Sequence, residues 1–277
     1  MLIGLFLLAF IAVAAVVYFV IPYSPLKAEY NRDIKERIER SSQATGTLTY
    51  KDVEDLPAPV KRYLETCGYI GKPRNAYMKI SFKNVDFKLS REKPMVKIDY
   101  SQVNFVREPD RVAFIDTRMY GIPFQGYDSL LEGRGGMKGV LAKGIPVFNE
   151  RGKDMDQACL VTFLSESLLI PDAALQNYIT WKEVDQTHAE ATIIYGGIEA
   201  SGLFTFSETG ELLSFSTDDR TYTSMNGERQ RVKWTALLSD YQTKGGCKQP
   251  SRLRAIWHVP EGDIVYFDSC DFRIDRL

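Results

Sequence analysis

The sequence predicts an α+β protein: a strongly curved, mostly antiparallel β-sheet, or half-barrel, that cradles one or more helices and follows an N-terminal transmembrane helix. Three observations support this fold class. The first residues form a long run without charge, many later segments alternate apolar and polar residues with a period of two, and one long apolar helix interrupts these segments. Antiparallel strands in series give a single sheet, whereas alternating βαβ units, which would give a parallel sheet, are missing.

The N-terminal run from Met1 to Ile21 contains no charged side chain and has the length that a helix needs to cross about 30 Å of hydrocarbon. A cleaved signal peptide would begin with basic residues, and none precede this run. The run ends in aromatic residues suited to a membrane interface, among them Tyr18 and Tyr23. We therefore predict an uncleaved single-pass anchor over residues 1–23, with the bilayer as its partner and the cell membrane as its location.

We predict that residues 24–49 form a charged juxtamembrane helix and a linker. Lys27 to Arg40 carries a thin apolar stripe every four residues, and the small polar stretch from Ser41 to Thr49 predicts a flexible spacer. Five Lys and Arg residues follow the membrane span, so the positive-inside count places the next domain in the cytoplasm. We expect residues 50–277 to form that single β-rich domain, which begins with a short helix from Pro57 that Gly68 ends.

Two long strands predict the curvature. In the first, apolar residues of 78–82 share one face and those of 85–89 share the other, which indicates a bulge at Lys83 and Asn84. Residues 96–105 repeat this change of face and predict a second bend. Bulges bend and coil a sheet, so two neighbouring bent strands are typical of a strongly curved one.

The remaining strands follow at hairpin spacing, with glycine- and proline-containing turns between them. We predict them near residues 111–118, 124–132, 188–195, 201–206, 211–216, 232–240, 253–259 and 264–274.

The segment from Asp154 to Ile170 is too long and too apolar for a strand, and Pro171 ends it. Its apolar residues cover nearly the whole helix circumference, which predicts burial inside the curve of the sheet. Glu166 lies on a mainly apolar face of this helix. A carboxylate removed from water needs a cation or several donors, and two interpretations follow. Glu166 is either a structural ion pair, for example with Arg220, or a polar anchor or general acid in an apolar cavity.

Other chemistry has little support in the sequence. With 35 Lys and Arg against 36 Asp and Glu, the chain lacks the clustered positive charge that binds nucleic acid, so we expect no nucleic-acid partner. Its two histidines and four scattered cysteines match no metal-ligand spacing, and we expect no metal and no cofactor. The cysteines are reduced core residues, disulfides or, least in keeping with their spacing, metal ligands. Glycines 133–139 fit neither phosphate-loop template and are typical of a strand end.

These patterns support one leading hypothesis and two alternatives. In the first, the protein is a membrane-tethered module that binds a lipid or acyl chain in a cavity between sheet and helix, without catalysis. Phe163, Trp181 and Trp257 would line this cavity, while Glu166 and Arg220 would orient a polar head. The alternatives are a non-enzymatic envelope scaffold with a filled core and a hydrolase for membrane substrates, for which no G-x-S-x-G serine is present.

Several elements together resemble a bacterial family of single-pass membrane proteins whose globular domain has no known function. The resemblance begins at Leu56 and continues to the C-terminus, apart from an aromatic residue that is missing just before Pro171. It implies an architecture similar to that of the half-barrel lipoprotein carriers, which would place the domain outside the cytoplasm, and it implies no known reaction or ligand. The matching residues are Leu56-Pro57-x-Pro59-Val60-x-Arg62-Tyr63-Leu64, Gly68, Gly71-x-Pro73, Gly133-Arg134-Gly135, Arg151-Gly152, Leu164-x-Glu166, Pro171, Trp181, Asp185, Arg220, Trp234, Asp240-Tyr241, Pro250, Trp257-His258 and Tyr266-Phe267.

Overall fold

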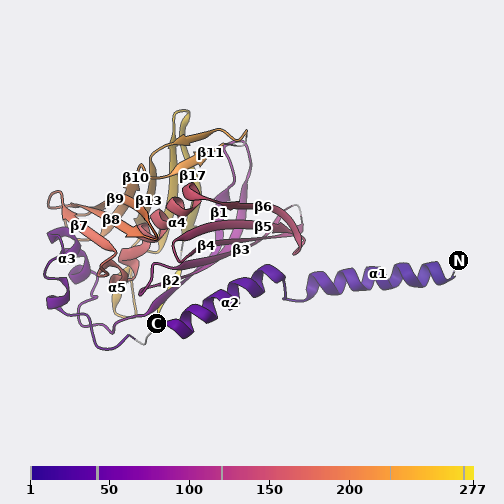
Figure 1. Ribbon diagram of the computed structural model, residues 1–277, viewed down its shortest axis with the longest axis horizontal. Coiled ribbons are helices and arrows are strands. Elements are labelled where there is room, and N and C mark those ends of the chain that lie inside the picture. Colours follow the sequence, from indigo (N-terminus) through magenta and orange to yellow (C-terminus); the bar gives the residue numbers. More distant parts are fainter. Residues whose placement is uncertain (1, 42–43, 120, 225, 271) are drawn as a thin grey trace.

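A single open antiparallel sheet is the main structural element of the protein (Figure 1). The computed structural model describes residues 2–41, 44–119, 121–224, 226–270 and 272–277. Within these residues the sheet has 14 strands in the order β6-β5-β4-β3-β2-β1-β17-β16-β13-β10-β9-β8-β7, and β18 pairs with β1 beside this path. Each of its strand pairs is antiparallel, and the sheet is not closed. The predicted fold class is therefore confirmed.

The strands of this sheet share the period of two that the sequence shows. Their bounds are β1 (Tyr77–Lys88), β2 (Met95–Phe105), β3 (Arg111–Met119), β4 (Ile122–Leu131), β5 (Arg134–Leu141), β6 (Ile145–Arg151), β7 (Ile179–Glu183), β8 (His188–Tyr195), β9 (Ile198–Phe206), β10 (Leu212–Thr217), β13 (Trp234–Ser239), β16 (Arg252–Val259), β17 (Gly262–Cys270) and β18 (Arg273–Arg276). Two small hairpins lie outside the sheet: β11 (Thr221–Thr223) with β12 (Arg229–Arg231), and β14 (Gln242–Lys244) with β15 (Cys247–Gln249).

The central helix α4 (Lys153–Glu166) lies inside the curve of the sheet (Figure 1). It contacts β5 near one end of the strand order and β9 near the other, which requires the sheet to bend around it. The helix predicted over 154–170 is present, but its last turn is the 3₁₀ helix η2 (Ser167–Leu169). Pro171 then starts the short helix α5 (Pro171–Ala174), since proline is well placed at a first helical position.

Glycines allow the two halves of the sheet and the helix to approach closely. Gly133, in the β4–β5 turn, and Gly196, in the β8–β9 turn, both have positive φ, and a Cβ on either would lie 2.9 Å from the other's Cα. A Cβ on Gly135 would lie 2.4 Å from the carbonyl oxygen of Met155 in α4. Turns from opposite halves of the sheet therefore touch, and the glycine cluster has a packing role.

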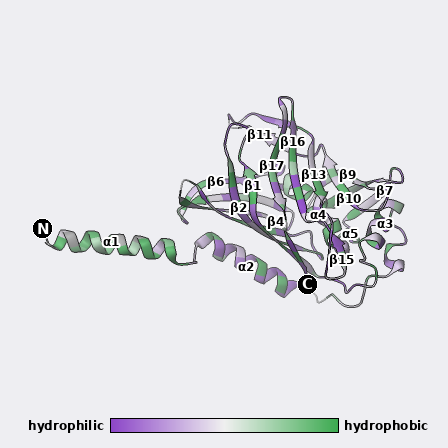
Figure 2. Cartoon of the chain, turned by 180° about the vertical axis from the view of Figure 1, so that it is seen from behind, coloured by the Kyte–Doolittle hydropathy of each residue, from purple (hydrophilic) through white to green (hydrophobic). Residues whose placement is uncertain are grey.

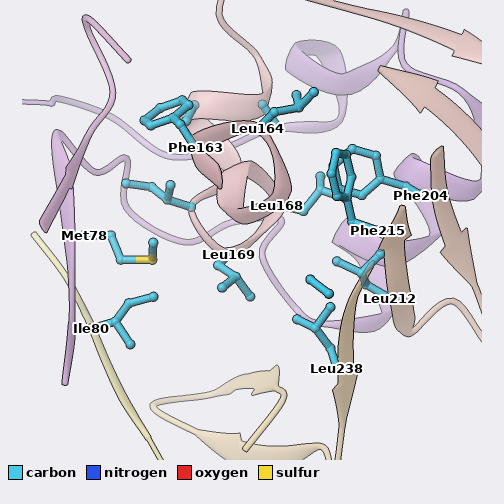
Figure 3. Packing of buried hydrophobic residues seen from close by; sticks show 14 of the residues in the cluster. Met78, Ile80, Phe163, Leu164, Leu168, Leu169, Phe204, Leu212, Phe215 and Leu238 are labelled. Atoms are coloured by element: carbon cyan, nitrogen blue, oxygen red, sulfur yellow. The ribbon is translucent and has the colours of Figure 1, made fainter. Parts of the chain in front are cut away.

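The main hydrophobic core brings together side chains of α4 and η2 with side chains of the sheet (Figure 3). Phe163 and Leu168 come from α4 and η2, Met78 comes from β1, and Phe204 comes from β9 in the opposite half; all are fully buried. Burying one such side chain contributes about 1.5–3 kcal/mol, so the apolar circumference of α4 is what holds it in place. The helix α3 (Ala58–Thr66) adds Tyr63, whose hydroxyl donates to the Leu168 carbonyl at 3.1 Å. The 3₁₀ helix η1 (Tyr50–Val53) precedes α3.

One of the two predicted bends is present and the other is not. The register of β1 against β2 shifts between Phe82 and Val85, and Asn84 has a φ of +52°, so the predicted bulge is confirmed. In contrast, β2 pairs with β3 without interruption from Asp99 to Asn104. The predicted bend in residues 96–105 is therefore wrong: both faces of this strand are apolar because helices cover both sides of the sheet.

The helix on the opposite, convex face of the sheet is α2 (Pro25–Arg40), which packs along β2, β3 and β4. Ser24 caps this helix by accepting from the Lys27 N–H at 3.2 Å. The Tyr30 ring lies 5.5 Å from Phe114 and 6.3 Å from Tyr127, measured between ring centroids. The predicted charged helix is thus present, but it is docked against the sheet and does not stand apart as a stalk.

The first helix, α1 (Leu2–Val20), projects away from the sheet (Figures 1 and 2). Among the residues that the structure describes, this is the one apolar helix whose length and composition suit a membrane span, and none of it is buried in the protein. Its C-terminal end meets the β5–β6 turn: Lys143 Nζ donates to the carbonyl oxygens of Tyr18 at 2.9 Å and Ile21 at 2.5 Å.

Candidate functional site

A cavity of about 220 Å³ lies between the concave face of the sheet and the C-terminal end of α4. Its wall is mainly apolar, and its polar members gather on one side, around the end of α4. The lining residues are Phe82, Phe87, Tyr100, Gln102, Arg111, Ile115, Asp128, Met137, Thr162, Ser165, Glu166, Leu169, Arg220, Trp234, Ala236, Leu238, Leu253, Ala255, Tyr266 and Phe267.

A buried arginine on β3 organises the polar side of this cavity. Arg111 donates through Nε to Glu166 Oε2 at 3.1 Å and through Nη1 to Asp128 Oδ2 at 2.7 Å. Its Nη2 donates to the Tyr100 hydroxyl and, at 3.3 Å, to Gln102 Oε1. Burial alone would lower the pKa of this guanidinium, but the neighbouring tyrosine and carboxylates raise it well above its usual value. Arg111 is therefore a fixed cation whose charge two carboxylates compensate.

Glu166, the last residue of α4, is held by three donors. Its Oε2 accepts from Gln102 Nε2 at 2.8 Å and Asn104 Nδ2 at 2.7 Å, in addition to Arg111. The charge of this carboxylate is thus compensated inside the protein, as the ion-pair interpretation predicts. However, the cation is Arg111 on β3, and the structure gives no ion pair between Glu166 and Arg220.

Arg220 is the second cation of the cavity, and its surroundings differ sharply from those of Arg111. It follows β10, and its guanidinium carbon lies 4.6 Å from the ring centroid of Trp234 and 5.1 Å from that of Trp257. Nε is buried, and nothing in the described part of the chain accepts a hydrogen bond from this side chain. Two indole faces stabilise a cation in part, but they do not neutralise it.

The five residues predicted to form the site occupy different places. Glu166 and Arg220 both line the cavity, and Trp257 lies against Arg220 without belonging to the described lining. Phe163 is fully buried and packs on Tyr178 at 6.1 Å between ring centroids. Trp181 packs on Phe204 and donates through Nε1 to the Ala174 carbonyl at 2.9 Å. Phe163 thus lies in the core and Trp181 packs against it, and neither is among the described lining of this cavity.

Sequence reasoning missed Arg111 and Trp234, together with the two amides on β2. A signal for the amides existed, because Gln102 and Asn104 interrupt an otherwise apolar face at positions two residues apart. Nothing local marked Arg111 as their partner, since it reaches Glu166 from 55 residues away.

The reactive side chains described near the cavity are not activated for chemistry. Burial raises the pKa of the Cys159 thiol well above its usual value, and Asp128, 3.5 Å away, raises it further, so this thiol stays protonated. All four cysteines are free, with Cys270 exposed. His188 and His258 pair with Asp185 and Asp263 and are not among the described lining. Within the described ranges, no three His, Cys, Asp or Glu residues could hold a metal ion.

The fold and this cavity define a class: an α+β protein whose open antiparallel sheet wraps around a helix and encloses a small, mainly apolar space with one uncompensated cation. The chain belongs to the family of unknown function DUF6544, which matches residues 46–269, and the predicted family resemblance is confirmed. No curated protein matches the sequence.

Two solved structures are similar in fold. One is a LolA superfamily protein from Nitrosomonas europaea, 10% identical, with 79% of this chain and 93% of that chain covered and a TM-score of 0.42. The other is a putative outer membrane lipoprotein-sorting protein domain from Vibrio parahaemolyticus, 11% identical, with 72% and 84% covered and a TM-score of 0.39.

Proposed function

We propose that this protein is a membrane-tethered binding module that holds an apolar ligand with an anionic head, such as a fatty acid or an acyl-chain phospholipid, in the cavity beside α4. In this proposal α1 is the membrane anchor and the chain does no chemistry on its ligand. The observation that carries the proposal is Arg220, a cation in an apolar cavity whose side chain has neither an ion-pair nor a hydrogen-bond partner in the described structure.

The electrostatics of the cavity favour an anionic head. Removing a cation from water is costly unless an anion or several acceptors replace the water. The carboxylates nearest the cavity, Glu166 and Asp128, already bond to Arg111. Arg220 therefore has its donors available for a carboxylate or phosphate, and such charge-assisted bonds are about twice as strong as neutral ones.

The apolar walls favour a chain behind that head. Side chains from β13, β16 and β17, among them Leu238, Leu253 and Phe267, face the same space as Arg220. Each methylene buried there would contribute about 0.8 kcal/mol. At about 220 Å³ the cavity is smaller than the roughly 300–1,000 Å³ typical of pockets for drug-sized ligands, so we expect it to hold one short acyl segment.

The main alternative is a scaffold protein of the envelope with a filled core. Such a protein needs no internal space, and a half-buried cation without an ion-pair partner would add nothing to its filled core. The cavity and Arg220 together therefore support the binding function, and the scaffold becomes the outcome if no ligand binds.

A binding measurement with matched arginine variants tests the proposal. The full chain, held in amphipol, is titrated with a fluorescent undecanoic acid. We expect one equivalent to bind and Arg220→Gln to weaken binding at least tenfold, because a hydrogen bond to a charged group contributes about 1.5–3 kcal/mol. Arg254→Gln is the control: its Nε is also buried without a partner, but Arg254 does not line the cavity. Absence of binding, or equal losses in both variants, would refute the proposal.

A further inference from the structure

The β5–β6 turn has a backbone that its sequence does not favour. Ala142 and Lys143 are its two central residues, with φ of +50° and +65°, and Gly144 N–H donates to the Leu141 carbonyl at 3.2 Å. Residues 142–144 form a three-residue loop between the paired Leu141 and Ile145, and hairpin loops normally carry asparagine or glycine at positions of positive φ. Two successive residues other than glycine in the left-handed backbone conformation raise the free energy of the folded chain. Such a conformation persists only where surrounding contacts hold it.

What holds this turn is the end of α1. Lys143 is buried, although lysine is rarely buried, and its Nζ donates to the carbonyls of Tyr18 and Ile21. These carbonyls belong to the last turn of α1 and to its C-terminal extension, where helical carbonyls lack partners and a cation is favourable. The Tyr18 hydroxyl in turn donates to the Ala142 carbonyl at 3.2 Å. The turn is therefore fixed to the end of the apolar helix.

Beside this junction the sheet exposes apolar side chains. Ile145 is 60% exposed, Val147 57% and Ile122 44%. Phe124 pairs with Leu141, and Leu141 pairs with Ile145, so Ile122 on β4 and Ile145 on β6 lie on the same face of the sheet, with β5 between them. Figure 2 shows hydrophobic colour at these hairpin ends, which point in the direction in which α1 leaves the domain. We call Ile122, Ile145 and Val147 the hairpin patch.

We propose that the hairpin patch is a second membrane contact, inserted into the headgroup region of the leaflet from which α1 emerges. The occupant of this surface is the lipid bilayer, because the patch is continuous with the end of a helix of membrane-spanning length and points the same way. The contact would fix the orientation of the whole sheet on the membrane, which a single tethering helix cannot do. This inference rests on the proposed function only in requiring that α1 crosses the bilayer.

Depth-dependent fluorescence quenching tests this contact. The full chain carrying Cys270→Ser is reconstituted in vesicles of phosphatidylcholine and phosphatidylglycerol, and bimane is attached through Ile145→Cys. We expect lipids with a nitroxide near the headgroup to quench this label more than lipids with a deep nitroxide, at a depth of about 5–10 Å. The matched control is Val184→Cys, which is 54% exposed and follows β7, at the opposite end of the sheet order. Its label should be quenched at least about twofold less, because interfacial insertion is shallow and local.

A third label, attached through Phe10→Cys in α1, separates the two possible failures. If the label at position 10 is quenched by deep nitroxides and the label at position 145 is quenched no more than that at position 184, the hairpin contact is wrong and the anchor stands. If the label at position 10 is not quenched either, α1 does not cross the bilayer, and both the contact and the tethering fail.

Discussion

The two faces of the sheet are both covered by a helix, but the helices are held in different ways. On the concave face, α4 is enclosed by the core, and the charges at its end belong to the buried network around Arg111. On the convex face, α2 rests on a small aromatic cluster. Several of its charged contacts, such as Glu29 with Lys138, are partly exposed, and Arg37 forms one buried ion pair with Asp110. Because exposed ion pairs contribute little and α2 buries fewer apolar side chains than α4, the concave helix should be integral to the fold and the convex helix separable from it.

The largest effect should come from Arg111→Met. This change leaves the buried Glu166 and the half-buried Asp128 without their cation, and breaking a buried ion pair in this way costs about 3–5 kcal/mol. We expect the free energy of unfolding of the sheet, measured with urea and tryptophan fluorescence, to fall by that amount. A loss below about 1 kcal/mol would show that the ion pairs of Arg111 contribute no more than exposed pairs do. The two helices would then not differ in how firmly their charges hold them.

The next effect tests the convex face. Tyr30→Ala removes the ring that contacts Phe114 and Tyr127, and truncating a buried aromatic side chain costs about 3–5 kcal/mol. We expect this cost to appear as detachment of α2 while the sheet stays folded. A spin label at Ile38→Cys, on the exposed side of α2, should become mobile, whereas tryptophan fluorescence should not change. Cooperative unfolding of the whole domain would show that α2 is not separable.

A smaller effect follows from alkaline pH. Burial raises the pKa of Tyr30 to about 12, and nearby Arg111 opposes part of this rise. An unfolded tyrosine titrates near pH 10, so the docked helix holds this proton more tightly than the detached one. The contribution of Tyr30 to docking is thus complete below pH 10 and is lost as the pH rises through 12. The spin label at position 38 should gain mobility over this pH range, and Tyr30→Phe should reduce the gain. If the mobility of the label depends on pH in the same way in Tyr30→Phe as in the wild type, Tyr30 is not the group that titrates.

The smallest change distinguishes the role of Glu166 from that of Arg220, two of the four charged residues in the described lining of the cavity. Glu166→Gln keeps the shape of the side chain but removes the charge that Arg111 compensates, and we expect about 1–3 kcal/mol of lost stability. Ligand affinity should stay within about twofold of wild type, because Glu166 acts through Arg111 and Arg220 holds the ligand head. A large loss of affinity with unchanged stability would instead make Glu166 the binding residue.

The sequence predicted those parts of the fold that depend on local pattern. The bulge near Asn84 follows from a change of apolar phase within β1, and the burial of α4 follows from its apolar circumference. The same phase rule failed in β2, because Val103 and Phe105 are apolar for another reason: α2 covers them. A change of face in one strand looks the same whether the strand bends or a second layer covers it, and the sequence of the strand alone does not distinguish these causes.

The site was predictable only in part, for a related reason. Glu166 was recognisable because a single carboxylate on an apolar helix must find a partner. The identity of that partner depends on which strand lies across the helix, and this was set by sheet order, which placed Arg111 and not Arg220 beside it. The places of Phe163 and Trp181 could not be derived from the sequence, because a large aromatic side chain packs equally well in a filled core and along a cavity wall.

The central claim, that Arg220 pairs with an anionic head, is tested most directly by a thermodynamic cycle. Dodecanoate and dodecanol differ only in the head, and each is titrated against the wild-type chain and Arg220→Gln in amphipol. We predict a coupling free energy of about 1.5–3 kcal/mol between the carboxylate and Arg220, with the alcohol binding almost equally to both proteins. A coupling of zero, with acid and alcohol responding alike to the substitution, would contradict the account.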